Sequence, residues 1–231
     1  MPSSSALKEF TDSLSIAEEL LKIERGYSNP PKSHEQKAVQ GLRGGVSVLV
    51  VASFERFLKE CIEEQLTTLT THPAISLNNL PDELKVCSTF NTLERAMKGQ
   101  RFQKAPPKKD RLTDVEAACR RVISNVVNPD SFSAVGANPN SDRVGEMMKN
   151  LAIRDVFTVL HSRFERKWRK PVAHTFIRDK LDEIVNRRHR VAHTALALGI
   201  SRGQLKESVR FLKILAELLD DEVRRKISGF R

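Results

Sequence analysis

Apolar residues recur at helical spacing along the first 70 residues of the chain. The first set, which predicts an amphipathic helix ended by the turn Asn29-Pro30-Pro31, comprises Leu7, Phe10, Leu14, Ala17 and Leu21. A longer helix is predicted over about 35–69, and its middle is apolar on most sides, with Glu55 embedded in it. A helix of that kind is buried on most of its surface, so we expect it at the centre of a bundle.

The helical pattern weakens between about 70 and 140. Turn-forming Asn, Pro and Gly residues surround two short predicted helices near 88–98 and 113–127. We interpret this region as a long, partly irregular insertion. Its basic stretch 98–111, which contains a Pro pair, predicts a solvated mobile loop, and a loop that contacts nucleic acid is the alternative.

Regular helical spacing returns in the last third of the chain. Helices are predicted over about 142–151, 155–167 and 172–192, and a final helix begins at Ser201, which forms a capping box with Gln204. No strand periodicity is present. The sequence therefore predicts an all-α, up-and-down helical bundle formed by one domain, 1–231, with an insertion at about 70–140.

The charge of the chain favours an anionic partner. Lys and Arg number 39 against 29 Asp and Glu, which gives a net charge of +10 and suggests nucleic acid or an acidic membrane surface. No apolar run approaches the roughly 20 residues of a spanning helix, so no membrane segment is expected. The N-terminus lacks a secretory pattern and the three cysteines form no disulfide framework, so a cytoplasmic location is expected.

The stretch "NRRHRVAHT", residues 186–194, concentrates charge near the end of the helix predicted over 172–192. At 100° per residue, Arg188 lies about 20° from Ile177, within the apolar stripe of that helix. A guanidinium there needs a partner or a wet cleft because it does not lose its charge. We expect Glu55 to be the partner of Arg188.

His189 and His193 are i, i+4 neighbours on an adjoining polar face that also carries Asn186. The metalloprotease pattern H-E-x-x-H has this spacing, but Arg190 stands where its Glu is needed, and nearby arginines repel cations. No metal or other cofactor is therefore expected. The composition of this face instead suits cleavage of RNA, since an imidazole can accept the proton of a ribose 2′-OH and a guanidinium can hold the phosphate.

Arg188, four intervening residues and His193 resemble the R-x4-6-H signature of the HEPN superfamily of α-helical ribonucleases and toxins, and His189 fits the position after its Arg. The helix "VLVVASFERFLKECIEE" and the segment "NPNSDRVGEMMKNLAI" are similar to those of RiboL-PSP-type HEPN domains. The resemblance covers most of the chain outside the insertion.

The resemblance implies a homodimer in which two motif copies face each other across a composite cleft. It also implies metal-independent endoribonuclease activity that leaves a 2′,3′-cyclic phosphate, acting in toxin–antitoxin systems or antiviral defence, with an antitoxin or regulatory protein as a further partner. Arg188 and His193 are the predicted catalytic residues together with His189. Glu55 and Asn186 are predicted to support them.

Further basic residues are candidates for RNA contact. They are Arg187, Arg190, Arg163, Arg166 and Lys167, the last three lying in a basic run whose simplest interpretation is a solvated helix face. A second function class stays open, namely a non-catalytic helical module that binds RNA or a protein. Metal-free RNA cleavage that depends on both Arg188 and His193 would discriminate between the two classes.

Overall fold

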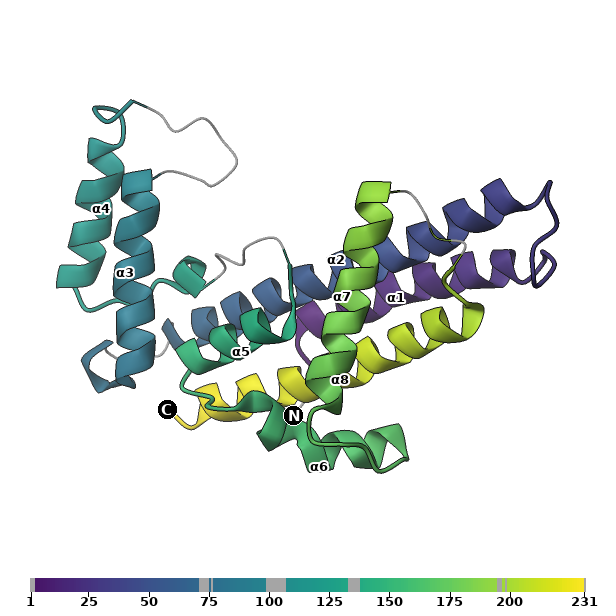
Figure 1. Cartoon of the computed structure of the whole chain (residues 1–231). Coiled ribbons are helices and arrows are strands. Elements are labelled where there is room, and N and C mark those ends of the chain that lie inside the picture. Colours follow the sequence, from purple (N-terminus) through teal and green to yellow (C-terminus); the bar gives the residue numbers. More distant parts are fainter. Residues whose placement is uncertain are drawn as a thin grey trace.

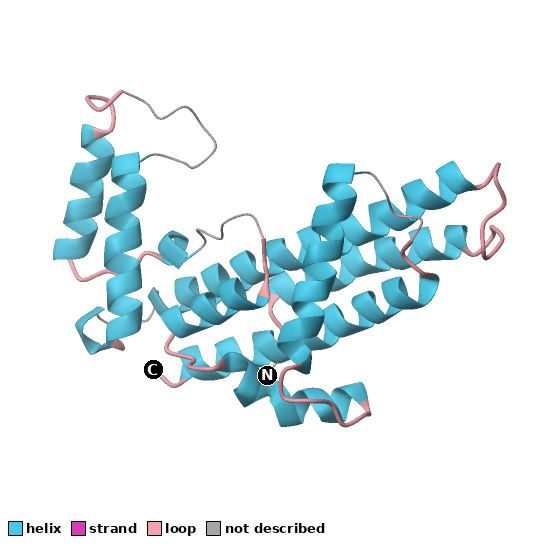
Figure 2. Ribbon diagram, viewed as in Figure 1, coloured by secondary structure: helices cyan, strands magenta, loops and turns pink. Residues whose placement is uncertain are grey.

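The chain folds into helices joined by turns. A computed structural model describes residues 3–70, 75, 77–98, 107–132, 138–194, 197 and 199–230, and within these ranges it contains no strand (Figure 2). The α-helices are α1 (Ser5–Glu24), α2 (Gln36–Thr70), α3 (Asp82–Lys98), α4 (Leu112–Ile123), α5 (Ser141–Asn150), α6 (Val156–Trp168), α7 (Phe176–Thr194) and α8 (Arg202–Ser228), and 3-10 turns cover Leu77–Asn79 and Pro129–Phe132. The prediction of an all-α bundle is confirmed.

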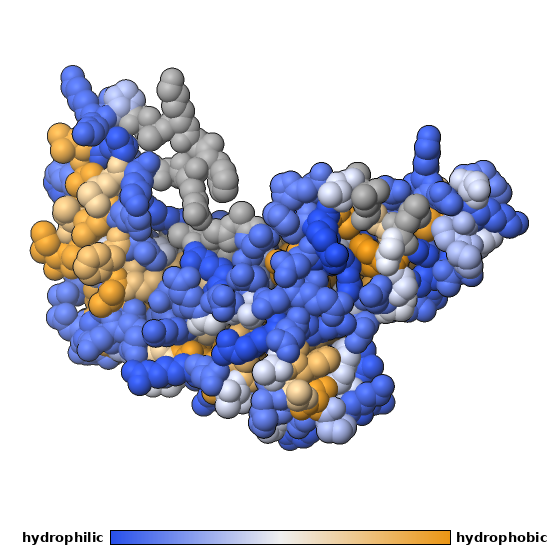
Figure 3. Space-filling view, in the orientation of Figure 1, coloured by the Kyte–Doolittle hydropathy of each residue, from blue (hydrophilic) through white to orange (hydrophobic). Residues whose placement is uncertain are grey.

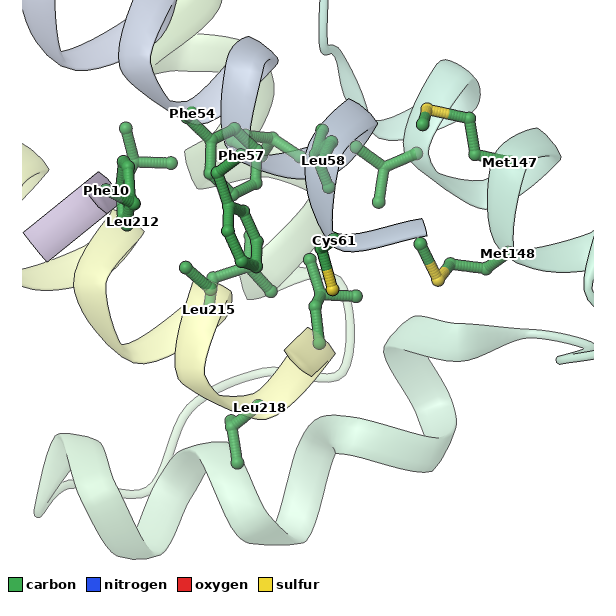
Figure 4. Packing of buried hydrophobic residues seen from close by; sticks show 14 of the residues in the cluster. Phe10, Phe54, Phe57, Leu58, Cys61, Met147, Met148, Leu212, Leu215 and Leu218 are labelled. Atoms are coloured by element: carbon green, nitrogen blue, oxygen red, sulfur yellow. The ribbon is translucent and has the colours of Figure 1, made fainter. Parts of the chain in front are cut away.

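Helix α2 is the centre of the bundle. Helices α1 and α8 pack along it, α7 lies across it, and α6 packs on α8 (Figure 1). The ring centroids of Phe10 on α1 lie 6.0 and 5.4 Å from those of Phe54 and Phe57 on α2. Leu212 and Leu215 of α8 line the same core (Figure 4). The expected central position of this helix follows from its apolar residues, which face α1, α7 and α8 in turn.

The predicted insertion contains a helical hairpin formed by α3 and α4. Helix α3 begins six residues earlier than the prediction near 88, because Pro81 and the first-turn acids Asp82 and Glu83 favour a helix start there. Helix α4 packs against α3 and has Ala118 as its buried residue. Most of the basic stretch 98–111 lies outside the described residues.

The outer face of this hairpin is apolar and exposed (Figure 3). Phe90 is 66% exposed and Ile123 is 79% exposed, which is unusual for large apolar side chains. The exposed apolar side chains of the region are Val86, Phe90, Met97, Leu112, Ile123 and Val126. No described helix combines the length and hydrophobicity that crossing a lipid bilayer requires.

A buried charge network joins α1, α2 and the start of α8. Glu24 is fully buried and forms ion pairs with Arg43 and Arg202. Arg43 also donates to the Ile200 carbonyl oxygen at 2.9 Å. The capping box predicted at Ser201 is present. These contacts fix the turn by which the chain enters α8 after the end of α7.

Candidate functional site

The last two turns of α7 carry the stretch 186–194 and lie close to α2. A Cβ built on Gly44 of α2 would come 3.3 Å from Cγ1 of Val191, a buried residue of that stretch. This distance is shorter than that of an ordinary van der Waals contact. Gly44 therefore permits the close approach of α2 to the part of α7 that carries this stretch.

Arg187 is the buried arginine of this stretch. It is 5% exposed, donates to Ser208 Oγ on α8 at 3.0 Å, and forms an ion pair with Glu183 one turn earlier on α7. Arg187 also lines a small interior gap with Val46 and Leu205. The expectation that Arg187 contacts RNA does not fit this placement, because its guanidinium is enclosed between α2, α7 and α8 and is already hydrogen-bonded.

Arg188 is half-buried at the edge of α7 that faces the segment before α5. Its Nη1 donates to Asn138 Oδ1 over a long distance of 3.5 Å, and its Nε is buried without a hydrogen-bond partner among the described residues. The helical spacing predicts Arg188 within the apolar stripe, but the structure leaves Arg188 half-buried and buries Arg187 instead. Helix α8 covers the side chain of Arg187, whereas the side chain of Arg188 faces the segment before α5.

Glu55 of α2 is half-buried and lies within electrostatic reach of Arg188. Burial raises the pKa of the Glu55 carboxyl above its usual range, and the positive charge of Arg188 acts in the opposite direction. The two side chains do not form a direct ion pair. The structure therefore brings the expected partners together at longer range, and leaves the buried Nε of Arg188 unpaired.

An anchor that the sequence analysis did not identify brings Asn138 to Arg188. Asp182 on α7 accepts hydrogen bonds from the backbone N–H and the hydroxyl of Ser141 at 2.7 and 2.8 Å. Asn140 caps α5 by accepting from the Arg143 N–H at 3.0 Å. The turn Asn138-Pro139-Asn140 precedes a predicted helix start in the sequence, and Asn is a common N-cap residue. Its contact with α7 could not be predicted from the sequence, because Asp182 and Ser141 are 41 residues apart.

The two histidines form a pair on the exposed side of α7. The ring centroids of His189 and His193 are 4.3 Å apart, with the rings at 61° to each other. Both side chains are exposed, as are Asn186 and Arg190. The last two turns of α7 therefore present the imidazoles to solvent and hold the guanidinium of Arg188 at a partly enclosed edge.

The basic run of α6 lies at the opposite end of α7 from the histidines (Figure 1). Arg163 donates to Glu222 Oε2 at 2.9 Å, and Lys167 forms an ion pair of 2.6 Å with Glu217. Arg166 is exposed. Two of these three predicted RNA contacts thus already have carboxylate partners on α8.

Comparison with known proteins identifies the family of this chain. No curated protein and no solved structure matches it. The model of the family described as RiboL-PSP-HEPN matches residues 11–225, a range that includes the whole site and the α3–α4 hairpin. The chain therefore belongs to the RiboL-PSP-HEPN family.

Proposed function

We propose that this protein is a metal-independent endoribonuclease whose site is formed by Arg188, His189 and His193. The observation that supports it most is the state of Arg188, which has a buried Nε without a partner and no carboxylate in direct contact among the described residues. An arginine with unmet donors binds phosphate well, because its planar group matches two phosphate oxygens. The exposed imidazoles stand on the same two turns of α7.

In the proposed reaction, His193 accepts the proton of a ribose 2′-OH as the oxygen attacks the adjacent phosphorus. The new P–O bond closes a 2′,3′-cyclic phosphate, and the bond from phosphorus to the 5′-oxygen breaks. That 5′-oxygen leaves as a hydroxyl after it receives a proton from a second imidazole. Arg188 offsets the negative charge that develops on the non-bridging oxygens.

The second imidazole is supplied by a second copy of the chain in this proposal. His193 and His189 are exposed at the surface of the bundle, so another motif can face them without displacing the core. A homodimer with a composite site is also what membership of the HEPN family implies. A role in toxin–antitoxin or antiviral defence, with a regulatory protein that restrains the nuclease, is proposed on the same ground.

The test is RNA cleavage in EDTA by the purified chain and its His193→Ala and Arg188→Ala variants, with His34→Ala as a matched control on an exposed histidine outside α7. We expect cyclic phosphate ends, a loss of about 100-fold or more in each site variant because general acid–base and electrostatic groups contribute that much, and no change in His34→Ala. Equal cleavage by wild type and His193→Ala would contradict the catalytic assignment.

The non-catalytic alternative has its own outcome in this experiment. RNA binding or dimerisation without cleavage across a broad RNA panel, unchanged by His193→Ala, would assign the chain to the class of helical binding modules. Cleavage that depends on added metal, or products without cyclic phosphate ends, would contradict the proposed reaction. RNA would still be the substrate in that case.

A further inference from the structure

A concave site lies where the end of α6 meets the middle of α8. Its volume is about 530 Å³, and its floor includes the buried side chains of Trp168 and Ile214. The remaining lining residues are charged: Lys167, Arg169, Lys170, Arg210, Lys213 and Glu217. We call this site the α6–α8 groove.

The charges of the α6–α8 groove are strongly unbalanced. Among the described lining residues Glu217 is the one carboxylate, and the ion pair with Lys167 neutralises it. Arg169, Lys170 and Lys213 are exposed and their side chains form no hydrogen bond or ion pair with described residues. Like charges gathered in a hollow create a local positive potential that attracts anions.

Two features hold the groove in shape before any ligand arrives. The Arg210 guanidinium lies 4.5 Å from the Trp168 ring centroid and donates to the Trp168 carbonyl oxygen at 2.7 Å. Arg169 ends α6 in the left-handed region, with φ 62° and ψ 28°, where residues other than Gly and Asn are uncommon. This conformation ends α6 and turns the chain at Arg169, beside Lys170 in the lining of the groove.

The floor of the groove indicates which part of an anion it accepts. One face of Trp168 is occupied by Arg210, and the ring also packs on Phe164, 5.6 Å away between centroids, and on Phe211. A nucleic-acid base therefore cannot stack on Trp168 without displacing these partners. Phosphates, by contrast, need only the exposed cations.

We infer that the α6–α8 groove binds the phosphate backbone of RNA at a distance from the cleavage site, an inference that rests on the proposed function. The ring centroid of Trp168 lies 5.9 Å from that of Phe176, the first residue of α7, so the groove adjoins the end of α7 opposite the histidines. Helix α7 has 19 residues and therefore separates its two ends by about 27 Å. A stacked strand covers that length with about 8 nucleotides at 3.4 Å each. An RNA must exceed this length to occupy both sites, so the groove favours long over short substrates.

The test is binding of labelled RNAs of about 6 and about 24 nucleotides, lengths on either side of that span, to chains that also carry His193→Ala so that no cleavage interferes. The groove variant combines Arg169→Asn, Lys170→Ala and Lys213→Ala, where Asn suits the left-handed conformation. The matched control, which removes the same charge elsewhere, combines Lys8→Ala, Lys32→Ala and Lys37→Ala at exposed positions.

For the long RNA we expect the groove variant to bind on the order of 30-fold more weakly at about 0.1 M salt, with a salt slope smaller by about 2, as three lost phosphate contacts require. The short RNA and the control variant should show little change. Equal losses for both RNA lengths or both variants would overturn the inference. So would groove-dependent binding of poly-glutamate that is tighter than that of RNA, because it would assign the groove to an acidic polypeptide.

This binding experiment separates the inference from the proposed function. If the chain cleaves no RNA in any assay but still binds long RNA more tightly than short RNA through an intact groove, the proposed nuclease activity is contradicted. The inference about the groove is then still supported. Intact cleavage with length-independent binding would contradict only the groove.

Discussion

Arg187 donates a hydrogen bond of 3.0 Å to the hydroxyl of Ser208, and through it α7 is joined to α8 beneath the candidate site. The next residue, Arg188, has no such anchor, and its buried Nε has no hydrogen-bond partner among the residues that the structure describes. Two adjacent arginines in one helix thus have different roles. Arg187 anchors the helix that carries the histidines, and Arg188 is the arginine that we propose for phosphate binding.

Substitution of Arg187 should therefore reduce stability more than substitution of Arg188. We expect Arg187→Ala to lower the free energy of unfolding by about 2–4 kcal/mol, because it leaves a cavity and an unpaired partner. Arg188→Ala should change it by less than about 1 kcal/mol, since that residue is only half-buried and has no direct ion pair with a described carboxylate. Urea denaturation measures both values, and Arg187→Met is the control that retains volume without charge.

A comparison of two glycines on α2 tests the close approach of α2 and α7. A Cβ on Gly44 would lie 3.3 Å from Val191, whereas a Cβ on Gly41 meets nothing within 4 Å. Gly41→Ala should stabilise the helix by up to about 1 kcal/mol because Ala is the better helix former. Gly44→Val should destabilise the fold by about 1–3 kcal/mol through overpacking.

The same pair of variants reports on function. Gly44→Val displaces the end of α7, so RNA cleavage should fall in that variant and stay unchanged in Gly41→Ala. The comparison uses RNA cleavage rates measured at a temperature at which both variants remain folded. Normal cleavage by a folded Gly44→Val chain would show that the site does not depend on the packing of Val191.

The limits of prediction from the sequence are clear at this site. The helices and the capping box at Ser201 follow from local spacing, and the structure confirms them. Helical spacing places Arg188 within the apolar stripe and Arg187 about 100° away from it, yet Arg187 is the buried residue, because burial depends on which neighbouring helix covers each side of α7. The bonds from Ser141 to Asp182 depend on tertiary contact, which no local pattern encodes.

The cysteines test the packing of the bundle and the hairpin. Burial raises the pKa of the Cys87 thiol to about 12, and the pKa of the buried Cys61 thiol is also well above its usual value. Cys119 on α4 is exposed. Because the thiolate is the reactive form, a thiol reagent should label Cys119 at neutral pH and spare the other two until the chain is unfolded. Peptide mass spectrometry of the labelled chain identifies each site, and rapid labelling of Cys87 in the native chain would contradict the packing of α3.

The pH dependence of stability provides a test of the Glu55 environment. Burial raises the pKa of Glu55 in the folded chain above its unfolded value, so the folded state binds this proton more tightly. The stabilisation that results is complete below the unfolded pKa and is lost as the pH rises through the folded pKa. Relative to Glu55→Gln, which does not titrate, the wild type should therefore become less stable as the pH is raised from about 4 towards neutrality.

The size of this effect is limited to less than about 1 kcal/mol, because the Glu55 side chain is only half-buried. Urea denaturation of both chains at several pH values measures it, and repeating the pair with Arg188→Ala is the control. Without the opposing charge of Arg188, the pKa of Glu55 should rise further and the loss of stability should shift to higher pH. If the wild type instead gained stability relative to Glu55→Gln with rising pH, the pKa of Glu55 would be lowered in the folded state. Glu55 and Arg188 would then form the close ion pair expected from the sequence, and Arg188 would no longer be an open phosphate site.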